Sequence, residues 1–217
     1  MKDNYYLNDL LKSPNEFMKN ISPDEVNEYE KLLEMFNKID ELIRKKETTN
    51  IAIDGNSGAG KSTLAEFISS IYKGNLFHMD DFFLRPEQKT EERLKEVGGN
   101  IDYERFNIEV INGLKSNSQF NYQTYNCQTL KLGQVHTVKP KVLNIVEGVY
   151  SMHPKFIDIY DYKIFLEIEE KTQIERILNR SGEFMLKRFI NEWIPMENKY
   201  FKEMNIRDES DMMLKLP

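Results

Sequence analysis

The chain has 217 residues, of which 40% are hydrophobic and 30% charged, and its formal net charge is −6. This length fits one large domain, or one domain with an appendage, and the apolar fraction is ample for a hydrophobic core. The negative charge argues against DNA or RNA as a partner, because proteins that bind nucleic acids usually present a basic face.

The N-terminal region is expected to be helical. Residues Met1–Tyr6 lack the apolar core of a signal peptide, and no long apolar run follows, so we expect a cytoplasmic protein that does not engage a membrane. Apolar residues between Leu7 and Met18 indicate one short helix. Ser22-Pro23-Asp24-Glu25 then starts a long helix, with an N-cap, a proline at the first helical position and acids in the first turn. The apolar face of this helix comprises Tyr29, Leu32, Leu33, Phe36, Ile39 and Ile43.

Residues 1–47 are therefore interpreted as a helical extension that packs on the flank of a main domain formed by residues 48–217. The alternative is an interaction or oligomerisation arm. A homo-oligomer is compatible with either interpretation.

A phosphate-binding motif follows the first predicted strand, Ile51-Ala52-Ile53. The motif G-x-x-x-x-G-K-[ST] is matched by Gly55, Asn56, Ser57, Gly58, Ala59, Gly60, Lys61 and Ser62, and Thr63 extends the predicted binding loop by one residue. Apolar residues then recur at helical spacing from Leu64 to Ile71, so the motif has the strand, loop and helix that it needs. Backbone N–H groups of such a loop surround phosphate oxygens, Lys61 reaches the β- and γ-phosphates, and the Ser62 hydroxyl ligates Mg²⁺. The sequence therefore predicts a nucleoside triphosphate site.

Two acids follow the second predicted strand, residues 75–79. Asp80 and Asp81 stand at the carboxyl end of that strand, where α/β sheets place their ligands. Asp is also well suited to turns, but beside a P-loop the functional interpretation is favoured. His78, on the strand itself, is interpreted as a core histidine.

The middle of the chain alternates charged and apolar segments. We expect a solvated helix over 86–96, a loop at 100–102, a helix over 103–114 and a β-hairpin over 122–138 that covers the site. Cys127 in this hairpin is the single cysteine, which excludes an intramolecular disulfide framework.

The last third of the chain completes the expected sheet. Glu147-Gly148 ends the apolar strand 141–146, which is the Walker B arrangement downstream of a P-loop. Further strands are expected at 162–168 and 211–216, with a helix at 170–179 between them.

A break at Ser181-Gly182 is bracketed by cations, Arg176 and Arg180 before it and Lys187 and Arg188 after it. These predict a lid near residues 176–190, although ordinary solvated helix charges are the alternative. The predicted fold is α/β, a three-layer P-loop NTPase-type fold with a mainly parallel sheet and helices on both faces, plus the hairpin and the N-terminal helical extension.

With these motifs in this order, residues 50–216 resemble the uridine kinase family. That family belongs to a wider P-loop group with phosphoribulokinase, pantothenate kinase and nicotinamide riboside kinase. By resemblance, Asp80 takes the proton from the acceptor hydroxyl, Asp81 contacts the substrate ribose, and Asp102 holds ribose hydroxyls.

The resemblance also implies roles for residues later in the chain. Glu147 falls on the family's acid near the metal and the acceptor, so Ser62, Asp80 and Glu147 are expected around Mg²⁺. Arg176 and Arg180 lie in what resembles the family's arginine-bearing lid.

One departure concerns the base of the acceptor. Uridine kinases carry a histidine in the hairpin that contacts the pyrimidine, and Cys127 stands at that position here. Tyr122 is kept and is expected to stack on a ring. Because Cys127 replaces the histidine, selectivity for a pyrimidine is not implied, whereas a hydroxylated small-molecule acceptor still is.

The predicted function is an ATP-dependent kinase that phosphorylates a hydroxyl of a nucleoside or nucleoside-like metabolite, with Lys61, Asp80 and Glu147 as catalytic residues. More acids surround the site than a bare nucleotide switch requires. The alternatives are a kinase for another metabolite, such as pantothenate or a sugar phosphate, and a regulatory P-loop NTPase.

Overall fold

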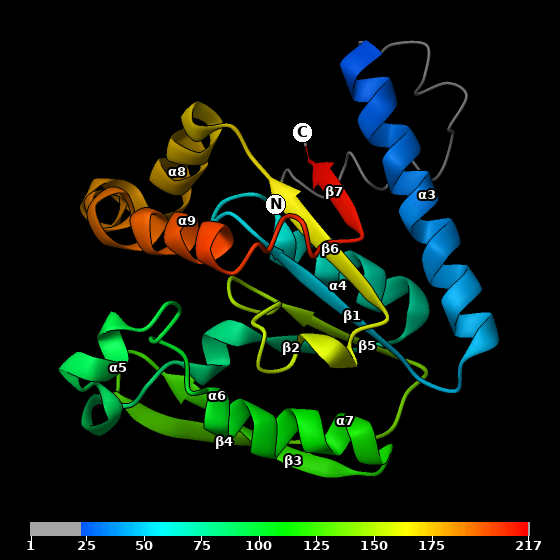
Figure 1. The fold of residues 1–217 in the computed structure, drawn as a ribbon, viewed down its shortest axis with the longest axis horizontal. Helices are drawn as coiled ribbons and strands as arrows, with labels where there is room; N and C mark the ends of the chain where they lie inside the picture. The colour runs from blue at the N-terminus through cyan, green and yellow to red at the C-terminus, as the bar shows by residue number, and fades with distance from the viewer. Residues whose placement is uncertain (1–22, 217) are drawn as a thin grey trace.

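The computed structural model describes residues 23–216, and its centre is a five-stranded parallel sheet in the order β2-β5-β1-β6-β7 (Figure 1). The strands are β1 (Thr49–Gly55), β2 (Asn75–His78), β5 (Leu143–Glu147), β6 (Tyr162–Glu167) and β7 (Met212–Lys215). All five predicted strands of this sheet are confirmed. Each is a short apolar run because a parallel sheet is covered on both faces.

Helices cover both faces of the sheet and confirm the three-layer α/β fold. Alternate residues of one strand point to opposite faces. Ile51 and Ile53 accordingly join a core cluster with α3 (Pro23–Lys45) and α4 (Lys61–Tyr72), while Ala52 between them joins the opposite cluster. The opposite cluster includes α6 (Tyr103–Phe106), η3 (Asn107–Ile111) and α7 (Asn112–Ser116), which follow one another as one helical segment.

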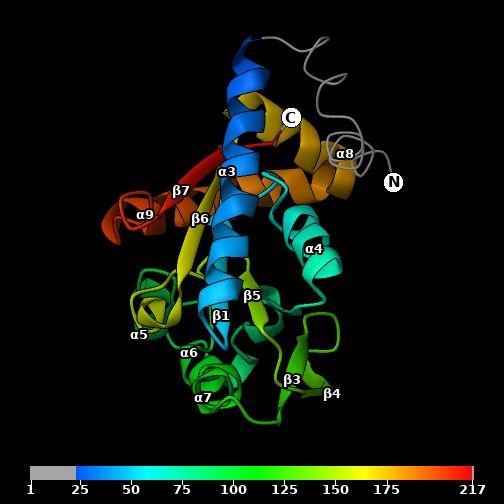
Figure 2. The ribbon, with the colours of Figure 1, turned by 90° about the vertical axis from the view of Figure 1, so that its right-hand side faces the viewer.

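The hairpin is formed by β3 (Phe120–Asn126) and β4 (Lys131–Val138), which pair antiparallel. This agrees with the prediction to within a few residues. The solvated helix expected over 86–96 is instead the short turn η2 (Pro86–Gln88) and the single-turn helix α5 (Glu91–Lys95). Figure 2 shows the hairpin and α7 at the end of the molecule opposite α8 (Glu170–Arg188).

The C-terminal helices lie beyond the carboxyl ends of β1 and β6 (Figure 1). The predicted break is present inside α8, where Gly182 has φ 77° and ψ 169°. The chain continues through η5 (Phe189–Trp193) into α9 (Ile194–Glu203), a helix that the sequence analysis did not anticipate. No helix among residues 23–216 is both long and apolar enough to cross a membrane.

The long helix α3 packs against β1 and α4. Met35 and Ile39 are fully buried in the cluster that contains β1 and α4, and Tyr72 donates a 2.7 Å hydrogen bond to the Asp40 carboxylate. Phe36 meets Phe67 of α4 edge to face. The short helix expected between Leu7 and Met18 lies outside the described residues.

We expect α3 to contribute to the stability of the whole fold. Met35→Ala should lower the free energy of unfolding by about 2–5 kcal/mol, because it leaves a cavity in a closed cluster. Leu33→Ala, on the more exposed side of the same helix, should change it by less than about 1 kcal/mol. Denaturant unfolding of both variants measures this difference, and equal small effects would show that α3 is only loosely attached.

Candidate active site

The P-loop leaves the sheet at a position that only glycine fits. Gly55 has φ +130°, and a Cβ atom there would lie 2.1 Å from the Leu166 carbonyl oxygen of the neighbouring strand. Gly60 has φ 96° and precedes α4, whose first turn has no side-chain cap. The free N–H groups of that turn therefore face the loop and favour an anion.

Lys61 lies inside this loop rather than in solvent. Its side chain is 8% exposed, and its ammonium group donates hydrogen bonds to the carbonyls of Gly55 at 2.8 Å and Asn56 at 3.0 Å. A buried cation bound only to neutral carbonyls is well placed to exchange them for phosphate oxygens.

Two carboxylates, those of Glu147 and Asp80, face the loop from the ends of neighbouring strands. Glu147 ends β5, and its Oε1 atom accepts a hydrogen bond from the Ser62 hydroxyl at 3.1 Å. His78, which pairs in register with Glu147, places Nδ1 2.6 Å from the same oxygen. This bond raises the pKa of His78. The interpretation of His78 as a core histidine was wrong, because its side chain is 38% exposed and orients Glu147.

Asp80 lies just after β2, in the short turn η1 (Met79–Phe82). Burial beneath the cleft, followed by the negative charge of Glu147, raises the pKa of Asp80. Burial also raises the pKa of the neighbouring Asp81. Asp80, Asp81 and Glu147 thus concentrate negative charge at this end of the sheet.

The oxygen donors at this position fit Mg²⁺. Within residues 23–216, no group of three or more His, Cys, Asp or Glu side chains is arranged to hold a metal ion. Ser62, Asp80 and Glu147 instead offer two carboxylates and a hydroxyl. Mg²⁺ is typically bound in this way, by one or two carboxylates together with substrate phosphates and water.

A cleft with a volume of about 1620 Å³ joins these groups. The predicted site residues that line it are Ser57, Gly58, Gly60, Lys61, Ser62, Thr63, Asp80, Cys127, Glu147, Arg176 and Arg180. Gly55, Asn56 and Ala59 are buried behind this surface as part of the loop. Asp81, Asp102 and Tyr122 do not line the cleft.

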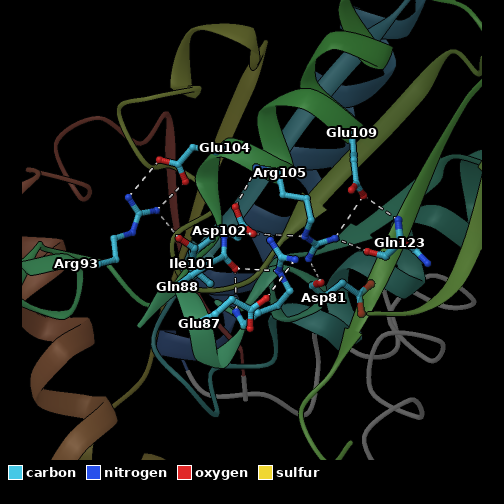
Figure 3. Close-up of polar contacts among 11 residues, drawn as sticks. Asp81, Glu87, Gln88, Arg93, Ile101, Asp102, Glu104, Arg105, Glu109 and Gln123 are labelled. Atoms are coloured by element: carbon cyan, nitrogen blue, oxygen red, sulfur yellow. Dashed lines mark hydrogen bonds and ion pairs between the residues drawn. The ribbon is translucent and has the colours of Figure 1, made fainter. Parts of the chain in front are cut away.

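Asp102 is held by a polar network instead (Figure 3). It is 2% exposed, its Oδ1 atom accepts a 3.0 Å hydrogen bond from the Arg105 backbone N–H, and its Oδ2 atom accepts one from Gln88 at 2.8 Å. The Arg105 guanidinium also donates to the backbone carbonyls of Asp81 and Gln123. Asp102 thus caps α6, and its predicted contact with ribose stays a prediction that requires these bonds to open.

Tyr122 is likewise enclosed by protein. Its ring is stacked with Phe82 at 5.9 Å and with His136 at 5.1 Å, and only 8% of the residue is exposed. Tyr125 lines the cleft in its place. A register shift in the hairpin between Gln123 and Tyr125 lets two tyrosines at an odd spacing both turn inward, which simple alternation does not predict.

The two predicted lid arginines differ in their contacts. Arg176 donates hydrogen bonds to the carbonyls of Gly58 at 3.3 Å and Leu216 at 3.1 Å, so it braces the P-loop against the end of β7. Arg180 lies one turn further and is exposed, with its guanidinium over the Phe189 ring at 5.7 Å. Both line the cleft.

Several residues that line the cleft or contact the P-loop were not among the predicted site residues. Glu197 of α9 and Gln173 of α8 contact the P-loop residue Ser57. The aromatic side of the cleft is formed by Phe83, Tyr125, Tyr150, Phe189 and Trp193. Phe83 and Tyr125 stand in stretches that carry the family resemblance, although neither was predicted to line the site, and Glu197, Tyr150, Phe189 and Trp193 belong to no motif.

A parallel sheet, a P-loop between its central strand and the following helix, and acids at the neighbouring strand ends define a P-loop kinase fold. Residues 50–183 match the family described as the phosphoribulokinase / uridine kinase family, and the chain belongs to it. It is an ATP-dependent phosphotransferase with a hydroxyl acceptor and acts on small metabolites.

The relatives include uridine kinases from staphylococci. The chain is 26% identical to the uridine kinase of Staphylococcus haemolyticus (strain JCSC1435) over 170 residues, which cover 71% of this chain and 82% of that protein. It is 25% identical to the uridine kinase of Staphylococcus aureus (strain JH9), covering 72% and 83%. A solved structure described as a possible uridine kinase from Bacillus stearothermophilus has a TM-score of 0.63, 21% identity, and covers 84% of this chain and 100% of that one.

We expect Lys61→Ala to lower phosphotransfer by roughly a hundredfold or more while the protein stays folded, because the variant loses the cation inside the loop. Steady-state turnover of ATP and the thermal unfolding temperature measure the two effects. Lys115→Ala, at an exposed position of α7, is the matched control. Normal turnover by a folded Lys61→Ala variant would show that the P-loop does not take part in the reaction.

Asp80→Asn and Glu147→Gln should separate the two acids. Asp80→Asn should lower kcat by roughly a hundredfold, because its expected task is the acceptor proton, and should change the affinity for Mg·ATP much less, because Ser62 and Glu147 remain to hold Mg²⁺. Glu147→Gln should also impair kcat and raise the Mg²⁺ concentration needed for half-maximal rate. Asp158→Asn, in an exposed turn, serves as control. A near-normal kcat of Asp80→Asn would show that Asp80 is not the base and would make Asp81 or Glu147 the candidate.

Proposed function

We propose that the protein transfers the γ-phosphate of Mg·ATP to a hydroxyl of a nucleoside or nucleoside-like metabolite. The observation that carries this proposal is that one cleft is lined both by the P-loop and by the carboxylates of Asp80 and Glu147. A bare nucleotide switch has no need of a base beside the transferred phosphate. A kinase needs one to orient and deprotonate its acceptor.

The proposed mechanism assigns a task to each group that faces the cleft. The N–H groups at the start of α4 and the Lys61 ammonium neutralise charge on the phosphates. Asp80 accepts the proton of the acceptor hydroxyl as the general base. Ser62, Asp80 and Glu147 would hold Mg²⁺, which supplies Lewis-acid stabilisation of the phosphate oxygens when bound.

The lid is proposed to complete the site from the other side. Arg180 is exposed beside the cleft and pairs with no carboxylate among the described residues, so it is available to contact phosphate. Gly182, with nothing within 4 Å of the position of a Cβ atom, gives the lid a break about which it can move. We propose the same division of the chain as the sequence indicates, an extension over 1–47 and a kinase domain over 48–217 with a lid near 176–190.

The acceptor is proposed to be a riboside. Support comes from relatives named uridine kinases and from the aromatic side chains of Phe83, Tyr125 and Tyr150 along the cleft, which suit a flat ring. Cys127 is exposed at the tip of the hairpin and lacks the strong hydrogen-bonding capacity of histidine. Selectivity for uracil should therefore be weak. Asp81 and Asp102 are proposed to contact the ribose.

An acceptor screen tests this proposal. ATP consumption should rise with a ribonucleoside or nicotinamide riboside, and mass spectrometry should show the added phosphate. A 2′-deoxyriboside should be a poorer substrate than the riboside, because buried acceptors built for hydroxyls penalise analogues that lack them.

The other outcomes of the screen identify the alternatives. A response to pantothenate or a sugar phosphate alone would contradict the riboside assignment and retain the kinase. Slow ATP hydrolysis that no acceptor stimulates would favour a regulatory NTPase. Asp80→Asn is included throughout, since acceptor-dependent turnover that survives in this variant would come from another site or a contaminant.

A further inference from the structure

The P-loop is held from outside by a residue that no motif identifies. The backbone N–H of Ser57 donates a 3.0 Å hydrogen bond to Oε2 of Glu197, and the Ser57 hydroxyl donates to Oε1 of the same carboxylate. Both oxygens of Glu197 are thus bound to one residue of the loop. Glu197 is 5% exposed and lines the cleft from α9, 140 positions further along the chain.

Ser57 is also held through its carbonyl oxygen. Gln173 of α8 donates a 2.9 Å hydrogen bond to that oxygen through Nε2. The N–H, the hydroxyl and the carbonyl of Ser57 are therefore all bound to residues that stand just before and just after the lid, Gln173 and Glu197. Ser57 is a fixed point of the loop, whereas the N–H groups at the start of α4 are left for phosphate.

A second contact fastens the same face of α9 to the strand before the loop. Tyr200 lies three residues after Glu197, which places both side chains on one side of the helix. Its hydroxyl donates a 2.8 Å hydrogen bond to Oδ2 of Asp54, a fully buried carboxylate that also accepts from the N–H groups of Gly55 at 2.7 Å and Met152 at 3.0 Å. The helix is therefore attached both before the P-loop and within it.

The charge of Glu197 indicates that this attachment has a function beyond packing. Burial raises the pKa of Glu197, while the positive charge of Lys61 and the bonds from Ser57 lower it. A buried carboxylate is costly unless it is fully hydrogen-bonded, and an apolar residue would pack here at less cost. What the carboxylate supplies is two directed bonds to a loop whose geometry decides phosphate affinity.

We propose that Glu197 is a positioning residue for the nucleotide: it fixes Ser57 and thereby holds the P-loop in the shape that receives the triphosphate. Because α9 follows the lid directly through η5, the same contact anchors the lid to the loop. The inference concerns the nucleotide side of the cleft and holds whichever hydroxyl compound is the acceptor.

The test is a double-mutant cycle read by nucleotide binding. The probe is a non-hydrolysable ATP analogue with Mg²⁺, whose Kd is measured calorimetrically on Glu197→Ala, Ser57→Ala and the double variant. Glu197→Ala should raise the Kd about tenfold, and Ser57→Ala less, because it keeps the backbone bond. The double variant should bind no worse than Glu197→Ala alone, since the two residues act through one contact.

Two further variants distinguish positioning from general damage to the helix. Glu197→Gln keeps an acceptor for the Ser57 N–H and should bind within about threefold of the parent protein. Glu203→Ala, half exposed near the end of α9, should leave the Kd within about twofold. If Glu197→Ala fails to fold, the Kd values of Ser57→Ala and Glu197→Gln still test the proposal. It predicts a raised Kd for Ser57→Ala and a Kd close to that of the parent protein for Glu197→Gln.

The proposal would be overturned by an unchanged Kd in folded Glu197→Ala, or by effects of Ser57→Ala and Glu197→Ala that simply add. The assay contains no acceptor, so its result is independent of the riboside assignment. If the double-mutant cycle shows coupling between Glu197 and Ser57 but no riboside stimulates turnover in the acceptor screen, only the proposed substrate is contradicted.

Discussion

The structure depends on the chain's turn out of the sheet at Gly55. That residue is paired with Leu166 of β6, and any side chain on it would penetrate the backbone of that strand. The close approach fixes the start of the P-loop at the carboxyl edge of β1. From there Lys61 folds back onto the Gly55 carbonyl, and the first turn of α4 faces the end of β5, where Glu147 stands. A fold determined by strand pairing therefore also determines the distance between the phosphate site and the acids.

The loop is surrounded by buried carboxylates that serve different purposes. Asp54 binds two N–H groups and a hydroxyl behind the loop, and burial raises its pKa to about 6. Because this folded-state pKa lies above the ordinary value, its contribution to stability is present at low pH and is lost as the pH rises through about 6. Glu197 holds the loop from the side, and Asp80 faces the cleft. Burial raises the pKa of all three of these acids and the positive charge of Lys61 lowers it, so the loop and the acids around it form one electrostatic unit.

Much of this arrangement could be predicted from the sequence, because it is encoded locally. The strands are apolar runs, the P-loop is a contiguous motif, and Asp80 and Glu147 stand at the carboxyl ends of two strands. The contacts of Glu197 and Tyr200 join residues 140 and 146 positions apart, and no local pattern reports such pairs.

Other differences arise where local rules compete. Asp102 sits in a loop that suits either a ligand contact or a helix cap, and the Arg105 N–H takes its carboxylate as a cap. A hairpin bulge turns Tyr125 toward the cleft and leaves Tyr122 between two rings, against the simple alternation of a strand. The stretch 86–96 breaks into η2 and α5 rather than forming one helix, because Thr90 is extended and its side chain caps a new helix by accepting a hydrogen bond from the Arg93 N–H.

Hydrogen–deuterium exchange with and without a non-hydrolysable Mg·ATP analogue tests the central claim most directly. The account predicts slower exchange at the N–H groups of residues 58–64 when the analogue is bound, together with slower exchange in the lid at 176–190. Ser57 should be protected already without the analogue, because its N–H is bound to Glu197. Protection confined to other parts of the chain, or rapid exchange of Ser57 in the free protein, would contradict the account.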